Sequence, residues 1–196
     1  GMSGVLFAAI AACLPILVTG GIHMDGYLDT VDALSSHQTR EKKLAIMKDA
    51  NCGAFAVIYG GVYLLAYAGF AYEVFAAGHI LLICPLFVLS RALSGLCAVN
   101  LPNARKSGML CAFTSGVQRR TATVALTLVG LAAAAGMVWM SPTAGGMAAA
   151  FAVLSALKYR RFALAQFGGV TGDTSGFFLQ LCELCGLIGI WIGGLL

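Results

Sequence analysis

The stretch TATVALTLVGLAAAAGMVWMSPTAGGMAAAFAVLSAL at residues 121–157 decides the fold, because it contains no charged residue. It is too long for one membrane-spanning helix, which needs about 20 apolar residues. The segment SPTAGG at residues 141–146, near its middle, is typical of a turn. The sequence therefore predicts two membrane helices joined by a tight hairpin.

Four further apolar runs flank this stretch. Residues 1–22 and 50–72 carry no charge, and Pro15 is expected to kink the first of them. Each of the two remaining runs carries one charge within a predicted span. These runs are residues 74–104, with Arg91, and residues 175–196, with Glu183.

The overall composition agrees with a membrane protein. Hydrophobic residues make up 60% of the chain and charged residues 10%, whereas soluble domains have about 25% charged residues. Lipid must therefore be the solvent for most of the surface. We predict an all-α fold: a polytopic integral membrane helical bundle of about six transmembrane helices, forming one domain over residues 1–196.

The basic residues favour one orientation in the membrane. With six spans, eleven of the twelve Lys and Arg residues fall on one side of the membrane, and Arg91 lies within a span. The eleven are Arg40, Lys42, Lys43, Lys48, Arg105, Lys106, Arg119, Arg120, Lys158, Arg160 and Arg161. Loops rich in Lys and Arg stay in the cytoplasm. We expect three cytoplasmic loops of about 15–30 residues, a length that usually carries function or short helices.

Three of the eight acidic residues lie in one short segment that follows the first run. Asp25, Asp29 and Asp32 are spaced i, i+4, i+7, so a helix would place them on one face. Like charges at this spacing repel one another, whereas a cation between them removes the cost. Carboxylate oxygens suit Mg²⁺ or Mn²⁺. The alternative is a solvated helix face, but a position at the membrane boundary favours a metal site.

Two other segments on the same predicted side carry an acid. Asp49 lies where the chain re-enters the membrane, as a helix N-cap, a site residue or both. The Gly-rich segment GGVTGDTSG at residues 168–176 contains Asp173 and precedes the last span. Free N–H groups at the start of that helix favour phosphate binding.

Two charges and one histidine complete the candidates. Arg91 and Glu183 are costly in lipid, which favours function over structural pairing, although pairing remains the alternative. Both are expected to face one cavity, where Arg91 suits a phosphate. The sequence does not decide whether His23 is a metal ligand, a general base or a hydrogen-bonded residue at the membrane boundary. The candidate residues therefore include carboxylates that suit Mg²⁺, together with cations and a Gly-rich loop that suit phosphates. No Ser-His-Asp set is evident, and the combination indicates phosphoryl transfer.

Three motifs in these segments resemble the cobalamin synthase family, adenosylcobinamide-GDP ribazoletransferase. They are TGGIHMDG at residues 19–26 continuing to Asp29 and Asp32, IMKD at residues 46–49 with Gly53, and TGD at residues 171–173 with Gly176 and Glu183. They occur in the family's order, and the resemblance covers essentially the whole chain.

The resemblance implies the last assembly of the nucleotide loop of vitamin B12. α-Ribazole or its 5′-phosphate would attack the pyrophosphate of adenosylcobinamide-GDP, releasing GMP and forming adenosylcobalamin or its phosphate. It implies a multi-pass enzyme of the prokaryotic plasma (inner) membrane that needs Mg²⁺. The expected partners are these substrates and the lipid bilayer, without nucleic acid; a homo-oligomer and a complex with pathway enzymes are both left open.

Carried onto this chain, the resemblance implies roles for individual residues. Asp25, Asp29 and Asp32 would bind Mg²⁺, with Asp173 or Asp49 completing the site. One carboxylate or His23 would take the proton from the ribose hydroxyl. Substrate and phosphate contacts are assigned to Lys48, Arg91, Gly172, Thr174, Gly176 and Glu183. Family members usually have an apolar segment ahead of the first span, and we expect this chain, which opens at Gly1, to lack it.

Two other functions are alternatives. CDP-alcohol phosphotransferases have the pattern D-x-x-D-G-x-x-A-R, whereas this chain has Asp25-Gly26 without an Asp three residues earlier or the Ala-Arg pair. A cation transporter would hold its acids near the bilayer midplane. Most acids here are predicted at the membrane boundary, which argues against transport.

Overall fold

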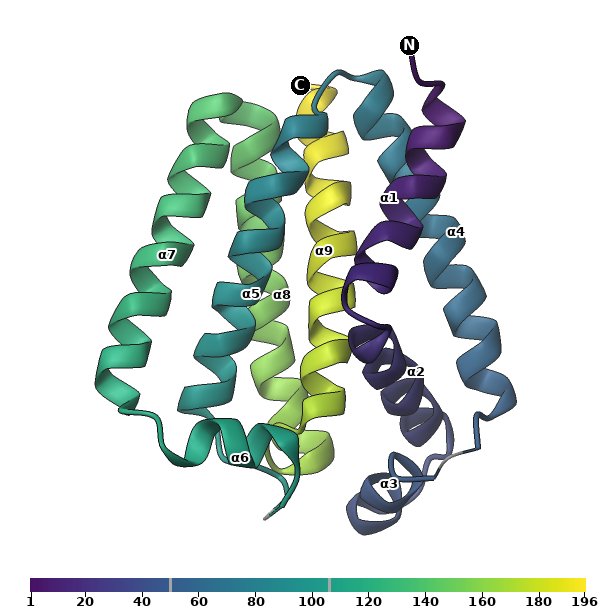
Figure 1. The fold of residues 1–196 in the computed structure, drawn as a ribbon, viewed down its shortest axis with the longest axis vertical. Coiled ribbons are helices and arrows are strands. Elements are labelled where there is room, and N and C mark those ends of the chain that lie inside the picture. The colour runs from purple at the N-terminus through teal and green to yellow at the C-terminus, as the bar shows by residue number, and fades with distance from the viewer. Residues whose placement is uncertain (50, 106) are drawn as a thin grey trace.

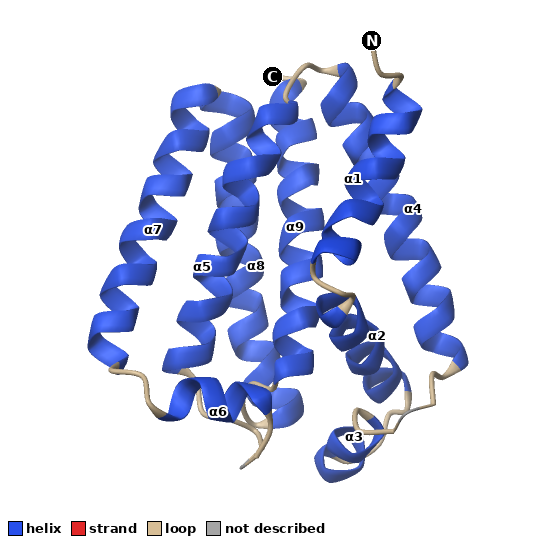
Figure 2. Ribbon diagram, in the orientation of Figure 1, coloured by secondary structure: helices blue, strands red, loops and turns tan. Residues whose placement is uncertain are grey.

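The computed structural model describes residues 1–49, 51–105 and 107–196, and within them every regular element is a helix (Figures 1 and 2). The helices are α1 (Gly4–Val18), α2 (Ile22–Ser35), α3 (Arg40–Ile46), α4 (Ala54–Ala76), the 3-10 helix η1 (Ile80–Leu82), α5 (Ile83–Asn100), α6 (Met109–Ser115), α7 (Arg119–Met140), α8 (Pro142–Phe167) and α9 (Gly172–Gly194). The all-α prediction is confirmed.

Several of these helices are suited to crossing a membrane. Four are long and apolar enough, namely α4, η1 with α5, α7 and α9. The pair α1 and α2 becomes a fifth candidate if it is one span bent by 93°. A polytopic helical membrane protein is therefore confirmed. The count of six stays a prediction, because α8, although 26 residues long, carries Lys158, Arg160 and Arg161 and is not among the candidates.

The bend between α1 and α2 lies at glycines rather than at the expected Pro15. Pro15 lies inside α1, and its carbonyl accepts a hydrogen bond of 2.8 Å from the Thr19 hydroxyl. Gly20 and Gly21 follow, with φ angles of 64° and 80°. Side chains other than glycine rarely adopt this conformation. The two glycines thus end α1 and direct α2 across the end of the bundle.

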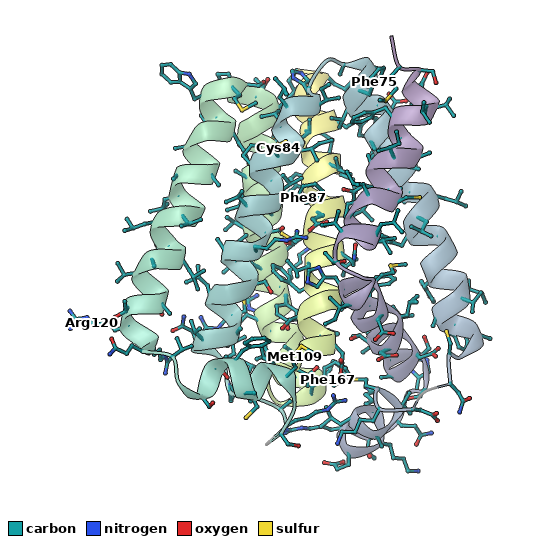
Figure 3. The ribbon with its side chains drawn as sticks, in the orientation of Figure 1. Phe75, Cys84, Phe87, Met109, Arg120 and Phe167 are labelled. Atoms are coloured by element: carbon teal, nitrogen blue, oxygen red, sulfur yellow. The ribbon has the colours of Figure 1, made fainter. Side chains whose placement is uncertain are left out.

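The segments α2–α3, α5–α6 and α8–α9 meet at one end of the bundle, here called the charged end, while both termini lie at the other (Figure 1). Arg120 projects outward from the start of α7 there (Figure 3). Lys106 lies outside the described residues. The third loop is shorter than predicted, because Lys158, Arg160 and Arg161 belong to α8 and only residues 168–171 connect α8 to α9. That the charged end is cytoplasmic stays a prediction.

The predicted hairpin between α7 and α8 is confirmed, but the turn is tighter than expected. The Ser141 hydroxyl accepts a hydrogen bond of 3.3 Å from the Ala144 N–H, and Pro142 begins the helix. Proline is favoured at this position because the N–H it lacks would have no partner in the helix. Residues 143–146, which were predicted as part of the turn, form the first turn of α8.

Small residues let the inner helices pack closely. On α9, a side chain at Gly189 or Gly193 would overlap the backbone of α8 around Ala148 and Ala144. Closely packed backbones of this kind are typical of helices in membranes, where burial of apolar surface gives little driving force. Helix α9 therefore forms the centre of the bundle, with buried residues along most of its length.

Two further glycines bring α2 against the start of α9. A Cβ atom at Gly26 would lie 2.7 Å from the Asp173 carbonyl oxygen, and one at Gly176 would lie 2.8 Å from the His23 carbonyl oxygen. Next to this crossing, the rings of Tyr27 and Phe177 stack with centroids 5.7 Å apart. The backbones of the first and third sequence motifs are thus in direct contact.

We predict that Gly26→Ala destabilises the protein in detergent by about 1–3 kcal/mol, because the added methyl group overpacks the crossing. The control is Gly61→Ala, since a Cβ atom there meets nothing within 4 Å. Alanine at an open position within a helix stabilises by about 0.4–1 kcal/mol. The two variants should therefore shift the thermal midpoint in opposite directions, and equal shifts would contradict the packing.

The start of α4 is capped by a residue far away in the sequence. The Asp32 carboxylate accepts hydrogen bonds from the backbone N–H groups of Gly53 and Ala56, the latter at 3.0 Å. Asp49 instead accepts from the backbone and side chain of Asn51, at 3.0 and 2.8 Å. The prediction that Asp49 is the N-cap of this helix is wrong, because Asp32 on α2 takes that role.

Asp32→Ala should therefore cost about 1–2 kcal/mol of stability, since two N–H groups lose their acceptor. Asp32→Asn should cost less, because its amide retains one acceptor oxygen. Asp49→Ala should change stability by less than about 0.5 kcal/mol, as expected for an exposed position. The thermal midpoints of the three purified variants measure these effects. A larger decrease in the midpoint for Asp49→Ala than for Asp32→Ala would contradict the capping role of Asp32.

Candidate active site

A cavity of about 380 Å³ lies at the charged end, between the start of α2, helix α6 and the start of α9. Met109, at the beginning of α6, marks its place in Figure 3. Its polar lining residues come from segments that are far apart in the sequence; they are His23, Asp25, Ser94, Asn103, Arg105, Ser107, Thr171, Asp173 and Ser175. The structure thus joins the first and third sequence motifs in one cavity.

The wall of the cavity is fixed by contacts between two loops. The Ala104 N–H donates to the Val170 carbonyl, and the Val170 N–H donates to the Pro102 carbonyl, both at 2.9 Å. Glycine is required at position 169, because a Cβ atom there would overlap the Pro102 carbonyl oxygen. Backbone pairing of this kind holds the segment before α6 against the Gly-rich segment before α9.

The Gly-rich segment is itself ordered by a capping box. The Thr171 hydroxyl accepts from the Thr174 N–H at 3.1 Å, and the Thr174 hydroxyl accepts from the Thr171 N–H at 2.9 Å. The Tyr159 hydroxyl also donates to Thr174, at 3.0 Å. Thr174 is fully buried and does not face the cavity, whereas Gly172 and Gly176 line it. Thr171 and Ser175 line the cavity in its place, and the substrate contact predicted for Thr174 stays untested.

Carboxylates from α2 and α9 converge here. Asp25 and Asp173 line the cavity and interact electrostatically with each other. Asp29, one turn further along α2, interacts electrostatically with both of them and with Asp32. The structure thus brings together three of the predicted metal ligands. The Asp32 carboxylate is occupied in capping α4, and its predicted metal role stays untested.

Arg105 is a site residue that the sequence did not identify. Its Nη1 donates to Asp173 Oδ2 at 2.8 Å, and its Nη2 donates to the Leu44 carbonyl at 3.1 Å. It also interacts electrostatically with Asp29. In the sequence Arg105 lies outside the three motifs and shares only its predicted membrane side with them, so nothing but the three-dimensional structure connects it to the acids.

Arg91 and Glu183 are paired inside the bundle. Their side chains form an ion pair, and Ser90 hydrogen-bonds to both of them. The Arg91 guanidinium also lies 5.3 Å from the centre of the Phe87 ring. This is the structural pairing that the sequence left open. The cavity lining includes neither residue, nor Lys48, so their predicted substrate contacts stay untested.

The acids fit a hard divalent cation by chemistry, although they are not arranged as a closed site. Among the described residues, no group of three His, Cys, Asp or Glu side chains lies close enough to hold a metal ion. The candidate donors Asp25, Asp29 and Asp173 are all carboxylates, the ligands that Mg²⁺ and Mn²⁺ prefer. The positive charge beside Asp173 is the guanidinium of Arg105.

Comparison with known proteins gives a consistent result. The family model described as cobalamin-5-phosphate synthase matches residues 1–191. A protein of Lachnoclostridium phytofermentans named adenosylcobinamide-GDP ribazoletransferase is 40% identical over 93% of this chain and 70% of its own length. Relatives of the same name from a Sinorhizobium species and from Pseudomonas fluorescens are 35% and 32% identical, over 91% and 94% of this chain and 71% and 75% of their own lengths.

No solved structure matches this chain significantly. The sequence comparisons carry the assignment, since the family model spans nearly the whole chain and the relatives are matched over more than two thirds of their own lengths. The cavity where His23, Asp25 and Asp173 meet contains residues from two of the three motifs that carried the resemblance. This chain belongs to the cobalamin-5-phosphate synthase family.

Proposed function

We propose that this chain is an adenosylcobinamide-GDP ribazoletransferase that acts in the cavity between α2, α6 and α9. In the reaction, a ribose hydroxyl of α-ribazole or its 5′-phosphate attacks the phosphorus bound to cobinamide. The new P–O bond forms as the bond to the GMP phosphate breaks, GMP leaves with the electron pair, and the hydroxyl proton passes to a base. The observation that carries this proposal is the meeting of carboxylates, a guanidinium and a Gly-rich helix start in one cavity.

The start of α9 provides the groups that would hold phosphates. Gly172 lies at its first position and is exposed, and a Cβ atom there would meet nothing within 4 Å among the described residues. Ser175 and Thr171 lie beside it in the cavity. Free N–H groups and the helix dipole at such a position attract anions. The pyrophosphate of the substrate would therefore lie against this end of α9.

Asp25, Asp29 and Asp173 would hold a Mg²⁺ ion, with Mn²⁺ as a substitute. When bound, the metal ion supplies charge neutralisation of the pyrophosphate and of the leaving GMP. The remaining tasks belong to the protein, which orients the two substrates so that the attacking and leaving oxygens are in line.

The proton of the ribose hydroxyl needs an acceptor within hydrogen-bond reach. His23 and Asp25 both line the cavity, from the first turn of α2. His23 also lies within electrostatic range of Arg91. Both residues are therefore placed to act as the base, and the backbone contact of His23 with Gly176 fixes its position relative to α9.

The basic residues support a specific orientation in the prokaryotic plasma (inner) membrane. Arg119 and Arg120 at the start of α7, and Arg40, Lys42 and Lys43 on α3, lie at the charged end. Segments rich in Lys and Arg remain cytoplasmic. We propose that the charged end, and with it the cavity, faces the cytoplasm, where it meets its nucleotide-activated substrate.

We predict that the purified protein in detergent with Mg²⁺ converts adenosylcobinamide-GDP and α-ribazole 5′-phosphate to GMP and adenosylcobalamin phosphate. Asp29→Asn and Asp173→Asn should each lower kcat/KM at least about a hundredfold, because each removes a carboxylate from the proposed metal site. Chromatography of GMP and of the corrinoid product measures both. Removal of the metal with EDTA should abolish turnover, and Mn²⁺ should restore it.

The matched control is Glu73→Gln, an exposed carboxylate near the end of α4 away from the cavity, which should retain parental activity. Loss of activity in this variant equal to that in Asp29→Asn would show that the effect is not local. Release of CMP from a CDP-alcohol, without GMP from adenosylcobinamide-GDP, would instead favour the phosphotransferase alternative.

A further inference from the structure

Arg105 lies beside Asp173, one of the acids that are proposed to bind the metal ion. Its Nη1 is 2.8 Å from Asp173 Oδ2, and its charge also acts on Asp29. The side chains of this pair are only 19% and 25% exposed. Within the described part of the cavity lining, Arg105 is the one Arg or Lys side chain. It therefore adds a positive charge, among the described lining residues, to the place where a metal ion would bind.

The hydrogen bonds of this guanidinium are incomplete. Nη1 has Asp173 and Nη2 has the Leu44 carbonyl, but the buried Nε has no partner among the described residues. A buried donor without an acceptor is unfavourable, because it has lost its hydrogen bonds to water. An arginine presents its donors in a planar fork that matches phosphate oxygens. Because Nε is buried, a phosphate in the cavity would meet this fork only after the guanidinium has moved away from Asp173.

A divalent cation and Arg105 would compete for Asp173. Two cations brought to one carboxylate repel each other, so binding of a metal ion weakens the ion pair. The freed guanidinium stays in the cavity, because its loop is held by the backbone bonds between Ala104, Val170 and Pro102. The charge most suited to it there is the phosphate that the metal ion itself attracts.

We propose that Arg105 is a phosphate-binding residue that changes partner. Without ligands it neutralises Asp173, and when a divalent cation occupies the acids it binds a phosphate group of the substrate. This inference rests on the proposed function for the identity of the substrate. The exchange itself requires only a divalent cation and a phosphate ligand, and can be measured without turnover.

The first test is Mn²⁺ binding to the substrate-free protein, followed by electron paramagnetic resonance. Arg105→Gln should bind Mn²⁺ about three- to tenfold more tightly than the parent, because the competing cation is gone. Arg105→Lys keeps the charge and should stay near the parent value. Arg120→Gln, which removes an exposed arginine at the start of α7, should not change the affinity. Unchanged or weaker Mn²⁺ binding in Arg105→Gln would overturn the competition.

The second test is binding of inorganic pyrophosphate, measured by calorimetry. With Mn²⁺ present, Arg105→Gln should bind it about tenfold more weakly than the parent, and Arg105→Lys should fall between them because it lacks the planar fork. Without metal, Asp173→Asn should bind pyrophosphate more tightly than the parent, since Arg105 is released. The double variant Asp173→Asn/Arg105→Gln should lose that gain.

These readouts separate the two proposals. Expected results in both binding tests, without turnover of adenosylcobinamide-GDP, would uphold Arg105 and refute the proposed substrate. Turnover by the parent, with pyrophosphate binding that does not depend on Arg105, would uphold the function and refute this role. If Arg105→Gln fails to fold, the metal-free comparison of Asp173→Asn with the parent decides, and no gain in pyrophosphate affinity would refute the exchange.

Discussion

The site depends on the close approach of two backbones, α2 and the start of α9. Gly26 and Gly176 make that approach possible, since a Cβ atom at either position would overlap the main chain of Asp173 or His23. The distance between helices in turn fixes the distance between Asp25 and Asp29 on one side and Asp173 on the other. The packing of small residues, which stabilises helices in lipid, therefore also sets the chemistry of the cavity.

The crossing places like charges together, and the structure balances them in two ways. Asp32, the last of the three acids on α2, turns to the N–H groups at the start of α4, where a negative charge is stabilised by the helix dipole. Asp173 is balanced by Arg105. Asp25 and Asp29 have no such partner among the hydrogen bonds and ion pairs of the described residues. The excess negative charge is thus concentrated where a divalent cation is expected.

Most of the fold followed from the sequence because lipid imposes a simple pattern. Long uncharged runs predicted the long helices, and the segment SPTAGG at residues 141–146 predicted the hairpin. The errors arose where local chemistry decides. Pro15 suggested a kink, but the bend required the positive φ angles of Gly20 and Gly21. Asp49 suggested a cap, but a cap can come from any acid that tertiary packing brings near, and here it comes from Asp32.

The site was predictable only as far as its motifs extend. Asp25, Asp29 and Asp173 share a membrane side in the sequence, and the structure brings them together. The buried carboxylate of Glu183 requires a partner, because a buried charge without one is far more costly than a pair. Arg91 is that partner, so pairing occupies both groups that were expected to contact the substrate. Arg105 belongs to no motif. It lies near the acids because backbone hydrogen bonds hold its loop against the segment before α9. Residue type and spacing in the sequence do not reveal such a contact between two loops. If the acids bind a divalent cation as proposed, the ion pair between Arg105 and Asp173 would oppose that binding until a phosphate is present to receive the guanidinium. We therefore expect the two ligands to be coupled: each should bind better with the other, because only together would they satisfy both Asp173 and Arg105.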